Sequence, residues 1–447
     1  MRGLRSLIVL LVIALPLGWY AYRDSTKPAD SGEPKRDKVF SVEADKIQEI
    51  SLKSESGERT RLQKSGTEWK IVAPAGAPPD SNEISSVASG IASLEMQSVV
   101  DENPPDLKDY GLAQPRIEVA FKADGKEQTL LIGQKTPPGT DLYAKRAGET
   151  KVFLIPGHLE SAFNKTTFDL RDKAVVKIDR DKLDALEFTA GDKTSRFAKP
   201  AGEWQIAAPV QARADFSAIE AIVSRLTGLQ MKSVVDTRDA PEADAKKYAL
   251  DKPAATIKFG SGSSQATLVV GGPAGEGTVY ARDLSRPAIV TIESSVLDEL
   301  KKDPSEYRQK DLFDARGFNA TRLEIVRAGQ TFAFEKTKVK NKEGQDEEKW
   351  RQLTPQAREL DQPAFDTLLS ALTGIRATGF VDAAAAKGLS TPELSATIKF
   401  DEGKKEEKVV LAKSGTDGFA SRAGEPGAAK VDASAIDAVT KALQELK

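Results

Sequence analysis

The feature that most constrains the fold is a helix-like segment that occurs three times. In the middle copy, Asp215 opens a stretch of apolar residues at helical spacing, and the segment closes at Asp236. The other copies run from Asp80 to Asp101 and from Asp361 to Asp382. A tryptophan precedes each copy at the same distance from the closing aspartate, namely Trp69, Trp204 and Trp350. We call these nine residues the repeat markers. Such self-similarity is typical of a tandem array of one structural unit.

The length of the chain agrees with three modules. At 447 residues it exceeds what one core usually supports, and about 150 residues per domain gives three domains. Each copy opens with a charged or polar triplet, and these are Arg36-Asp37-Lys38, Arg171-Asp172-Lys173 and Arg308-Gln309-Lys310. The predicted modules are therefore residues 36–170, 171–307 and 308–447.

Local patterns predict an α+β module built on antiparallel sheets. Short segments with period-two alternation, such as residues 186–188 and 256–259, are bounded by Gly, Asp or Pro, which favours strands joined by hairpins. About seven such segments and two helices are expected in each copy. The main helix has one apolar face and should pack on the sheet. A second, short helix beginning near His158, Ser295 or Ser434 should end each copy.

Aspartate is expected to begin each main helix. The carboxylates of Asp80, Asp215 and Asp361 can accept hydrogen bonds from the free amides of the first turn, where the helix dipole also favours a negative charge. Ser217 and Glu220 have the spacing of a capping box. After each closing aspartate, a loop should lead to a turn that ends in proline.

The N-terminal segment predicts a membrane anchor. Residues 4–22 form an apolar run that, at about 1.5 Å per residue, is long enough to cross the hydrocarbon of a bilayer. Arg2 and Arg5 would keep the N-terminus cytoplasmic and place the bulk of the chain outside. A cleaved signal peptide and a buried helix are the alternatives, and bulky Trp19 and Tyr20 do not suit a cleavage site. We expect an anchor over residues 1–23 and a flexible linker over residues 24–35.

The charge balance disfavours nucleic acid as a partner. The chain has 65 Lys and Arg against 67 Asp and Glu, a net charge of -2, with the signs interspersed rather than gathered into a basic face. Cysteine is absent, which excludes a thiol nucleophile, a thiolate metal site and a lipid-modified N-terminal cysteine. This composition is compatible with an extracytoplasmic location.

No pattern in the sequence predicts a catalytic residue, a cofactor or a metal ion. The single histidine, His158, lies at an expected helix start without a signalled partner group. Asp101, Asp236 and Asp382 would suggest a carboxylate site if they met, but aspartate bonds readily to nearby backbone, so each is expected to cap the following loop. The glycines of residues 270–277 lack the helix and the Lys-Ser/Thr pair of a phosphate-binding loop, which favours a hairpin connection.

The apolar leader and the repeated modules together resemble a bacterial family called domain of unknown function 4340. The resemblance is carried by the tryptophan strand, the helix opened by aspartate, the Val-Val-Asp segment and the Tyr-Gly-Leu-x-x-Pro turn at residues 110–115. It covers nearly the whole chain after Arg36 and is weaker in the third copy, where the turn begins with Lys387. The resemblance implies a membrane-tethered periplasmic protein, often encoded beside ABC-type transporter components of the auxiliary gliding-motility kind. That family has no established catalytic residues, so the resemblance implies none.

The expected function is that of a non-enzymatic, membrane-anchored scaffold that docks an envelope protein or a transporter component. One alternative is an envelope glycan- or peptide-binding protein that uses grooves between modules, with Trp69, Trp204 and Trp350 as stacking surfaces. For these tryptophans, however, the expected place is the core beside the sheet. A second alternative, a hydrolase, would require acidic residues to gather in one copy.

Overall fold

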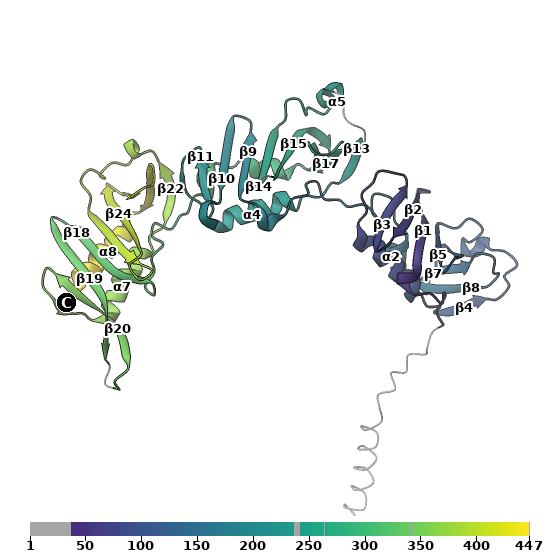
Figure 1. The fold of residues 1–447 in the computed structure, drawn as a ribbon, viewed down its shortest axis with the longest axis horizontal. Coiled ribbons are helices and arrows are strands. Elements are labelled where there is room, and N and C mark those ends of the chain that lie inside the picture. The colour runs from purple at the N-terminus through teal and green to yellow at the C-terminus, as the bar shows by residue number, and fades with distance from the viewer. Residues whose placement is uncertain (1–36, 237–241, 263, 341–342, 447) are drawn as a thin grey trace, which may run out of the picture. The chain divides into compact units, whose positions relative to one another are not determined.

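The part of the chain that the structure describes contains three antiparallel sheets in succession (Figure 1). The computed structural model describes residues 37–236, 242–262, 264–340 and 343–446. The chain divides after Asp172 into two compact units, and the second unit begins at Lys173. The anchor expected over residues 1–23 and the linker expected over residues 24–35 lie outside the described residues. Within the described ranges, no helix has both the length and the apolar character needed to cross a membrane.

Module 1 contains an eight-stranded sheet with the order β3-β2-β1-β5-β6-β7-β8-β4. Its strands are β1 (Ile47–Lys53), β2 (Arg59–Ser65), β3 (Glu68–Ala73), β4 (Ser98–Asp101), β5 (Ile117–Ala123), β6 (Lys126–Lys135), β7 (Asp141–Arg146) and β8 (Val152–Pro156). Its helices are α2 (Ser81–Ser93) and α3 (Glu160–Phe163), with short 3-10 helices η1 (Ala44–Lys46), η2 (Lys108–Tyr110) and η3 (Gly157–Leu159).

Module 2 contains a nine-stranded sheet with the order β12-β11-β10-β9-β14-β15-β16-β17-β13. Its strands are β9 (Ala185–Ala190), β10 (Lys193–Ala198), β11 (Gln205–Ala208), β12 (Ala212–Arg213), β13 (Ser233–Asp236), β14 (Ala255–Ser261), β15 (Ser264–Gly275), β16 (Thr278–Asp283) and β17 (Ile289–Glu293). Its helices are α4 (Phe216–Thr227), α5 (Glu242–Lys247) and α6 (Ser295–Leu300), with η4 (Arg180–Lys182), η5 (Pro200–Gly202) and η6 (Pro304–Tyr307).

Module 3 repeats this order in nine strands, β21-β20-β19-β18-β23-β24-β25-β26-β22. Its strands are β18 (Ala320–Arg327), β19 (Gln330–Lys340), β20 (Asp346–Thr354), β21 (Arg358–Glu359), β22 (Ala377–Val381), β23 (Leu394–Phe400), β24 (Lys405–Ser414), β25 (Asp417–Arg422) and β26 (Ala428–Asp432). Its helices are α7 (Gln362–Thr373), α8 (Ala433–Glu445) and η7 (Ala383–Ala385). The two-residue edge strands β12 and β21 are the additions relative to module 1.

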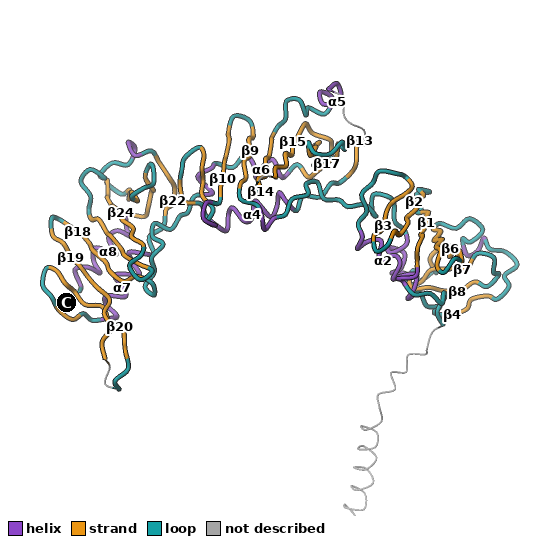
Figure 2. Tube along the Cα trace, in the orientation of Figure 1, coloured by secondary structure: helices purple, strands orange, loops and turns teal. Residues whose placement is uncertain are grey.

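Each main helix buries the face that the sequence pattern marks as apolar. In α4, Ile219, Ile222, Val223 and Leu226 are buried at helical spacing. Strands β9 and β14 alternate between buried and less buried residues, as expected of a sheet with one face on a core. Figure 2 shows α4 running alongside these strands. Periodicity of 3.6 in the helix and of two in the strands therefore builds one shared core in each module.

The α+β class and the triplicate antiparallel sheet are confirmed, and three local expectations are corrected. The terminal helix of module 3 is not short, because α8 has 13 residues, the same length as α2, and packs its buried face on the sheet and against α7. Module 2 forms helix α5 where only a loop was expected. The sheets have eight or nine strands rather than about seven, because the segment before each closing aspartate also pairs as a strand, as do the residues before the helix start in modules 2 and 3.

The segment that leaves module 1 or module 2 returns to the start of the main helix of that same module. In module 2, the N–H of Asp215 donates to the carbonyl of Tyr307, and the N–H of Gln309 donates to the carbonyl of Arg213. In module 1, the same two bonds join Asp80 to Leu170 and Asp172 to Pro78. The basic residue that opens the next module, Arg171 or Arg308, lies between these bonds and pairs as an isolated bridge with Pro79 or Ala214. The residues that begin the helix therefore also fix the exit of the chain.

Candidate functional site

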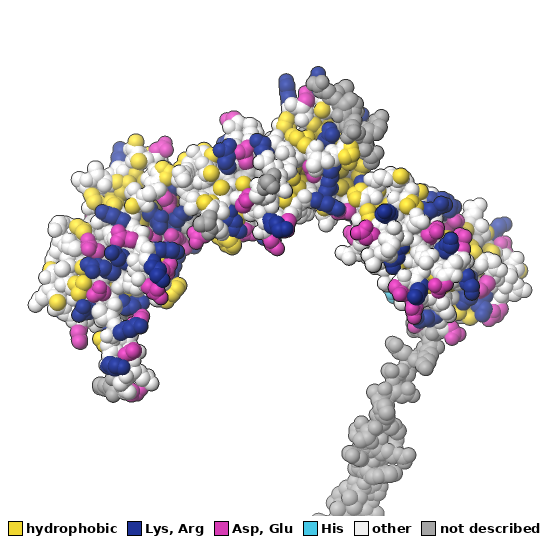
Figure 3. Space-filling view, in the orientation of Figure 1, with side chains coloured by type: hydrophobic (Ala, Val, Ile, Leu, Met, Phe, Trp, Pro, Cys, Tyr) yellow, Lys and Arg dark blue, Asp and Glu magenta, His cyan; other side chains and the backbone are white. Residues whose placement is uncertain are grey.

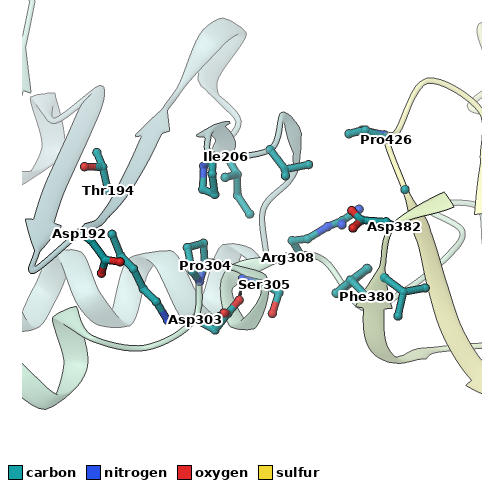
Figure 4. A pocket seen from close by; sticks show the side chains of 15 residues that line it. Asp192, Thr194, Ile206, Asp303, Pro304, Ser305, Arg308, Phe380, Asp382 and Pro426 are labelled. Atoms are coloured by element: carbon teal, nitrogen blue, oxygen red, sulfur yellow. Dashed lines mark hydrogen bonds and ion pairs between the residues drawn. The ribbon is translucent and has the colours of Figure 1, made fainter. Parts of the chain in front are cut away.

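A groove of about 570 Å³ lies between modules 2 and 3, inside the second compact unit (Figure 4). From module 2 it is lined by Asp192, Lys193, Thr194, Ile206, Pro209, Val210, Asp303, Pro304 and Ser305. From module 3 it is lined by Arg308 at the start of the module, by Phe380, Val381 and Asp382 at the edge strand β22, and by Pro426 and Gly427 in the turn before β26. Strands β11 and β12 form one end of the sheet in module 2, and β22 ends the sheet in module 3. The groove therefore separates two sheet edges.

Tight turns position the side chains of the module 2 wall. Asp192 and Lys193 follow Gly191, whose positive φ of 64° allows the turn between β9 and β10. The carboxylate of Asp303 caps η6 by accepting from the N–H of Ser305 at 2.9 Å. The hydrogen bonds from Ser305 hold the pKa of Asp303 below its usual value, so this carboxylate is charged at neutral pH. The wall therefore presents fixed negative charge.

Close backbone approach shapes the module 3 wall. Gly427 has a φ of 77°, and a Cβ at this position would lie 2.7 Å from the carbonyl oxygen of Val381. Only glycine therefore fits where the chain turns beside β22. Next to it, the guanidinium of Arg308 lies 3.9 Å from the centroid of the Phe380 ring. This cation–π contact joins the first residue of module 3 to its edge strand.

Arg308 forms the floor of the groove and is 8% exposed. It pairs with Glu425 at 3.3 Å, and its Nε is buried without a hydrogen-bond partner. Burial lowers the pKa of the Arg308 guanidinium, and the charge of Glu425 opposes this change. A buried cation is stable only when it is paired, so Glu425 is essential to the floor.

Glu425 also receives Arg213 from module 2, and this links the two modules. Arg213 Nε lies 2.5 Å from Glu425 Oε1, while Arg213 Nη1 lies 2.5 Å from Asp314 Oδ1. Burial lowers the pKa of Arg213, but the hydrogen bond and charge of Glu425 and the charge of Asp314 outweigh it and leave the pKa raised. Arg422 bonds both Asp314 and buried Glu407. We call Arg213, Arg308, Asp314, Glu407, Arg422 and Glu425 the junction network, and it gives the groove a fixed floor.

The rim of the groove carries more negative than positive charge. Lys193 faces Asp303 at 3.9 Å, and Arg308 is matched by Glu425. Among the interactions of the described residues, Asp192 and Asp382 have no side-chain partner. On the face seen in Figure 3, basic and acidic side chains are interspersed. The lining of the groove therefore presents two carboxylates without an ion-pair partner.

The three helix-start aspartates occupy the expected position but do not behave alike. Asp80 accepts from the N–H groups of Asn82 and Glu83, and Asp215 accepts from the N–H of Ala218. Asp361 precedes α7 without any side-chain capping bond, so its predicted cap is wrong. In module 3 the next residue contacts the neighbouring strand instead. The side chain of Gln362 bonds the N–H and the carbonyl of Trp350 at 2.8 Å each.

The three closing aspartates belong to three different sheets, where Asp101 and Asp236 end the edge strands β4 and β13, and Asp382 directly follows the edge strand β22. Asp101 caps its loop by accepting from the N–H of Asn103 at 2.9 Å, as expected. For Asp382 the expected side-chain cap is wrong, because its backbone carbonyl accepts from Ala385 while its carboxylate faces the groove. Asp236 ends β13, and its side chain lies outside the described part of the structure. Figure 4 shows Asp382 beside Arg308.

The three tryptophans lie in the cores, as expected, which removes the stacking surfaces required by the glycan alternative. Trp69, Trp204 and Trp350 are 4%, 5% and 5% exposed. Trp204 lies immediately before β11, and its Nε1 donates to Glu220 at 2.8 Å. The predicted capping box at Ser217 and Glu220 is therefore wrong, because Glu220 is used by the tryptophan and by Arg180.

The remaining candidates have structural positions. His158 is exposed in η3, beside α3, as the sequence predicted. The glycines of residues 270–277 lie at the hairpin between β15 and β16, as expected. Across residues 37–446, apart from the undescribed gaps, no group of three His, Cys, Asp or Glu side chains could hold a metal ion.

Sequence reasoning missed the junction network. The sequence pattern marks Arg308 only as the opening residue of a module and does not distinguish Arg213, Glu407 or Glu425 from other charged residues. One signal was available, because the residue two positions before the helix-start aspartate differs among the copies. It is Pro78, Arg213 and Glu359 in turn. A charged residue that departs from an otherwise regular repeat indicates a contact specific to one module.

Together, the three like sheets and the groove define a tandem-repeat α+β protein with a potential binding site at the second junction. The chain belongs to the family called domain of unknown function (DUF4340), whose sequence model matches residues 69–203 and 204–392. No curated protein matches it. One solved structure is detected, the DNA polymerase III subunit beta from Pseudomonas aeruginosa, at 10% identity over 71% of this chain and 86% of that chain. Its TM-score is 0.15, so this match carries no argument about the fold.

Proposed function

We propose that the chain is a non-enzymatic, membrane-anchored extracytoplasmic scaffold that docks an envelope protein, such as a component of an ABC-type transporter. The observation that carries this proposal is the junction network, which joins modules 2 and 3 through charged side chains that are at most 20% exposed, apart from Asp314 at 43%. A scaffold must hold its docking surfaces at a fixed spacing, and rigid walls reduce the ordering cost of binding. Membership in the DUF4340 family and the apolar run at residues 4–22 support the membrane-anchored setting.

The proposal is tested by capturing the tagged, full-length chain from membranes cross-linked in intact cells. The same envelope protein should be enriched in every replicate. Glu425→Ala should reduce its recovery because it leaves Arg213 and Arg308 with less compensation at the junction. Asp298→Asn, at an exposed residue in α6, is the matched control and should leave the recovery unchanged. Failure to enrich any specific envelope protein would contradict the proposal.

A second candidate function is peptide binding in the groove between modules 2 and 3. It is favoured by the size of the groove, because ligand sites commonly occupy about 300–1,000 Å³. A glycan is the weaker occupant, since the three tryptophans are buried and the Phe380 ring is already covered by Arg308.

A further inference from the structure

We infer that the groove between modules 2 and 3 binds an extended peptide segment of the docked protein, with one basic side chain at Asp192 and another at Asp382, which lie on opposite walls of the groove (Figure 4). The inference rests on the scaffold function proposed above. It assigns to that function a site, a class of ligand and the residues that select the ligand.

The negative charge of the groove favours basic side chains in the bound segment. Lys193 and Arg308 are matched by Asp303 and Glu425, so Asp192 and Asp382 supply the unmatched charge of the groove. Both carboxylates are exposed, and lysine or arginine side chains of a bound segment can reach each of them without displacing an existing ion pair. An acidic glycan, a phosphate or a nucleic acid would instead meet like charge.

The apolar lining selects a peptide rather than a lone cation. Pro209, Val210 and Pro426 are exposed on opposite walls, and Val210 is 40% exposed. These side chains offer contacts to the apolar neighbours of a basic residue, and they cannot donate hydrogen bonds to a sugar. The occupant is therefore a segment that alternates or combines basic and apolar side chains.

The groove lies along an edge strand, which suits an extended backbone. Strand β22 has β26 as its neighbour and ends the sheet. Its bulge lies between Ala377 and Gly379, whereas the register is regular from Gly379 to Val381, beside the groove. Extended peptides commonly bind at such edges, where pockets for alternate side chains give specificity. The junction network holds this edge in place before binding, which lowers the ordering cost.

The test places a photo-cross-linking amino acid at Val210 of the full-length chain in native membranes. Leu284 is the control position, because it is 56% exposed in the same module and does not line the groove. The cross-linked segment is sequenced and synthesised as a peptide, and its affinity for the purified full chain is measured. We expect cross-links from Val210 to one extended segment that contains Lys or Arg. Replacing Asp192 and Asp382 together by Asn should weaken the peptide about five- to tenfold, whereas Asp298→Asn should not.

The outcomes separate this inference from the scaffold proposal. If a partner is captured but cross-links only at Leu284, or cross-links through a segment without a basic residue, the groove inference is overturned and the scaffold proposal stands. A cross-link from Val210 to a second copy of the chain, or an affinity unchanged by the paired Asn substitutions, would also overturn it. If neither position nor the capture experiment yields a partner, the scaffold proposal itself fails.

Discussion

Modules 2 and 3 share one strand order but fill the same space in their cores with different residues. Four positions after the helix-start aspartate, module 3 has Phe365 and module 2 has the smaller Ile219. Phe365 is fully buried, with its ring centroid 4.6 Å from that of Trp350 and 5.0 Å from that of Phe334. The core of module 3 is thus closed by a residue of its own main helix.

In module 2, the core volume that Phe365 fills in module 3 is filled by a residue of the segment that leaves the module. Tyr307, at the end of η6, is 2% exposed and packs edge-on against Phe197 and Phe188, with ring centroids 5.3 Å and 6.1 Å apart. The Tyr307 hydroxyl donates to the carbonyl of Glu299 at 3.2 Å, and burial raises its pKa. The repeat therefore conserves the volume of the core and not the residue that supplies it.

A second difference lies in the turn that follows strand β16 in module 2 and the corresponding strand β25 in module 3. By register, Asp283 in module 2 corresponds to Arg422 in module 3, and each has a partner three residues later, Arg286 or Glu425. The ion pair is therefore reversed in sign. In both modules the later residue contacts the incoming linker, because Arg286 donates to the carbonyl of Ala174 and Glu425 accepts from Arg308. Both modules therefore have a contact with the incoming linker at this position, but only in module 3 is the contact part of a larger network of ion pairs.

The largest expected effect tests whether Tyr307 in module 2 and Phe365 in module 3 fill equivalent parts of their cores. Tyr307→Ala should destabilise module 2, and Phe365→Ala should destabilise module 3, each by about 3–5 kcal/mol, because each leaves a cavity among buried rings. Each module contains one tryptophan, so a chain that keeps only Trp204 or only Trp350 reports the unfolding of one module by fluorescence in urea.

The double variant Tyr307→Ala, Ile219→Phe then sharpens the comparison. It places in module 2 the ring that module 3 carries, and it should recover at least about 1 kcal/mol of the loss. Tyr307→Phe is the control and should cost only about 1 kcal/mol, for the lost hydrogen bond to Glu299. If the double variant shows no recovery, Tyr307 stabilises module 2 by holding the segment that leaves the module and not by filling volume in the core.

A smaller loss is expected from Glu407→Gln. Glu407 is 4% exposed and accepts from the N–H groups of Asp314 and Ala315 as well as from Arg422, whereas its counterpart by register in module 2 is Ala266. Removal of the negative charge leaves Arg422 with weaker compensation, and module 3 should lose about 3 kcal/mol. The Trp350 reporter measures this loss, and the Trp204 reporter should show a smaller change. Equal shifts in both reporters would mean that the two modules unfold as one unit.

The third prediction concerns pH. The hydrogen bond from Trp204 holds the pKa of Glu220 below its usual value, with Arg180 contributing. Because the folded-state pKa is lower than the unfolded value of about 4.3, the stabilisation is present above that pH and is lost as the pH falls through the folded-state value. Glu220→Ala should therefore cost about 1–2 kcal/mol at pH 7. Urea unfolding read by Trp204 at pH 7 and at pH 3.5 should show a smaller pH effect in Glu220→Gln than in the unsubstituted chain.

Module 3 is the internal control for this pH effect. Its tryptophan is held through the backbone by the neutral side chain of Gln362, which does not titrate. Gln362→Glu should therefore introduce a new dependence on acid at the Trp350 reporter. An identical pH response in Glu220→Gln and the unsubstituted chain would contradict the assignment of the acid effect to Glu220.

The sequence predicts what local rules determine and misses what distant residues assemble. The apolar helix faces and the buried tryptophans follow from spacing within a few residues, the repeated modules follow from the recurrence of these patterns along the chain, and all are present. The groove could not be predicted, because it brings together the turn at Asp192, the segment at Pro209, the linker at Arg308 and the edge strand at Phe380. No local pattern states that Arg213 and Glu425 meet, since they lie in different modules. The cap predicted at Asp361 is wrong for a different reason, which the last prediction tests.

The smallest expected effect separates two helix starts that look alike in sequence. Asp215→Ala should cost about 1 kcal/mol, because its carboxylate accepts from the N–H of Ala218. Asp361→Ala should cost only about 0.3 kcal/mol, since the dipole interaction alone remains to be lost. Gln362→Ala should cost more than Asp361→Ala, because its amide ties the helix to both backbone groups of Trp350. If Asp361→Ala and Asp215→Ala have equal costs at their respective tryptophan reporters, α7 is capped in solution as α4 is. In that case module 3 would not differ from module 2 in using the contact of Gln362 with Trp350 in place of a helix cap.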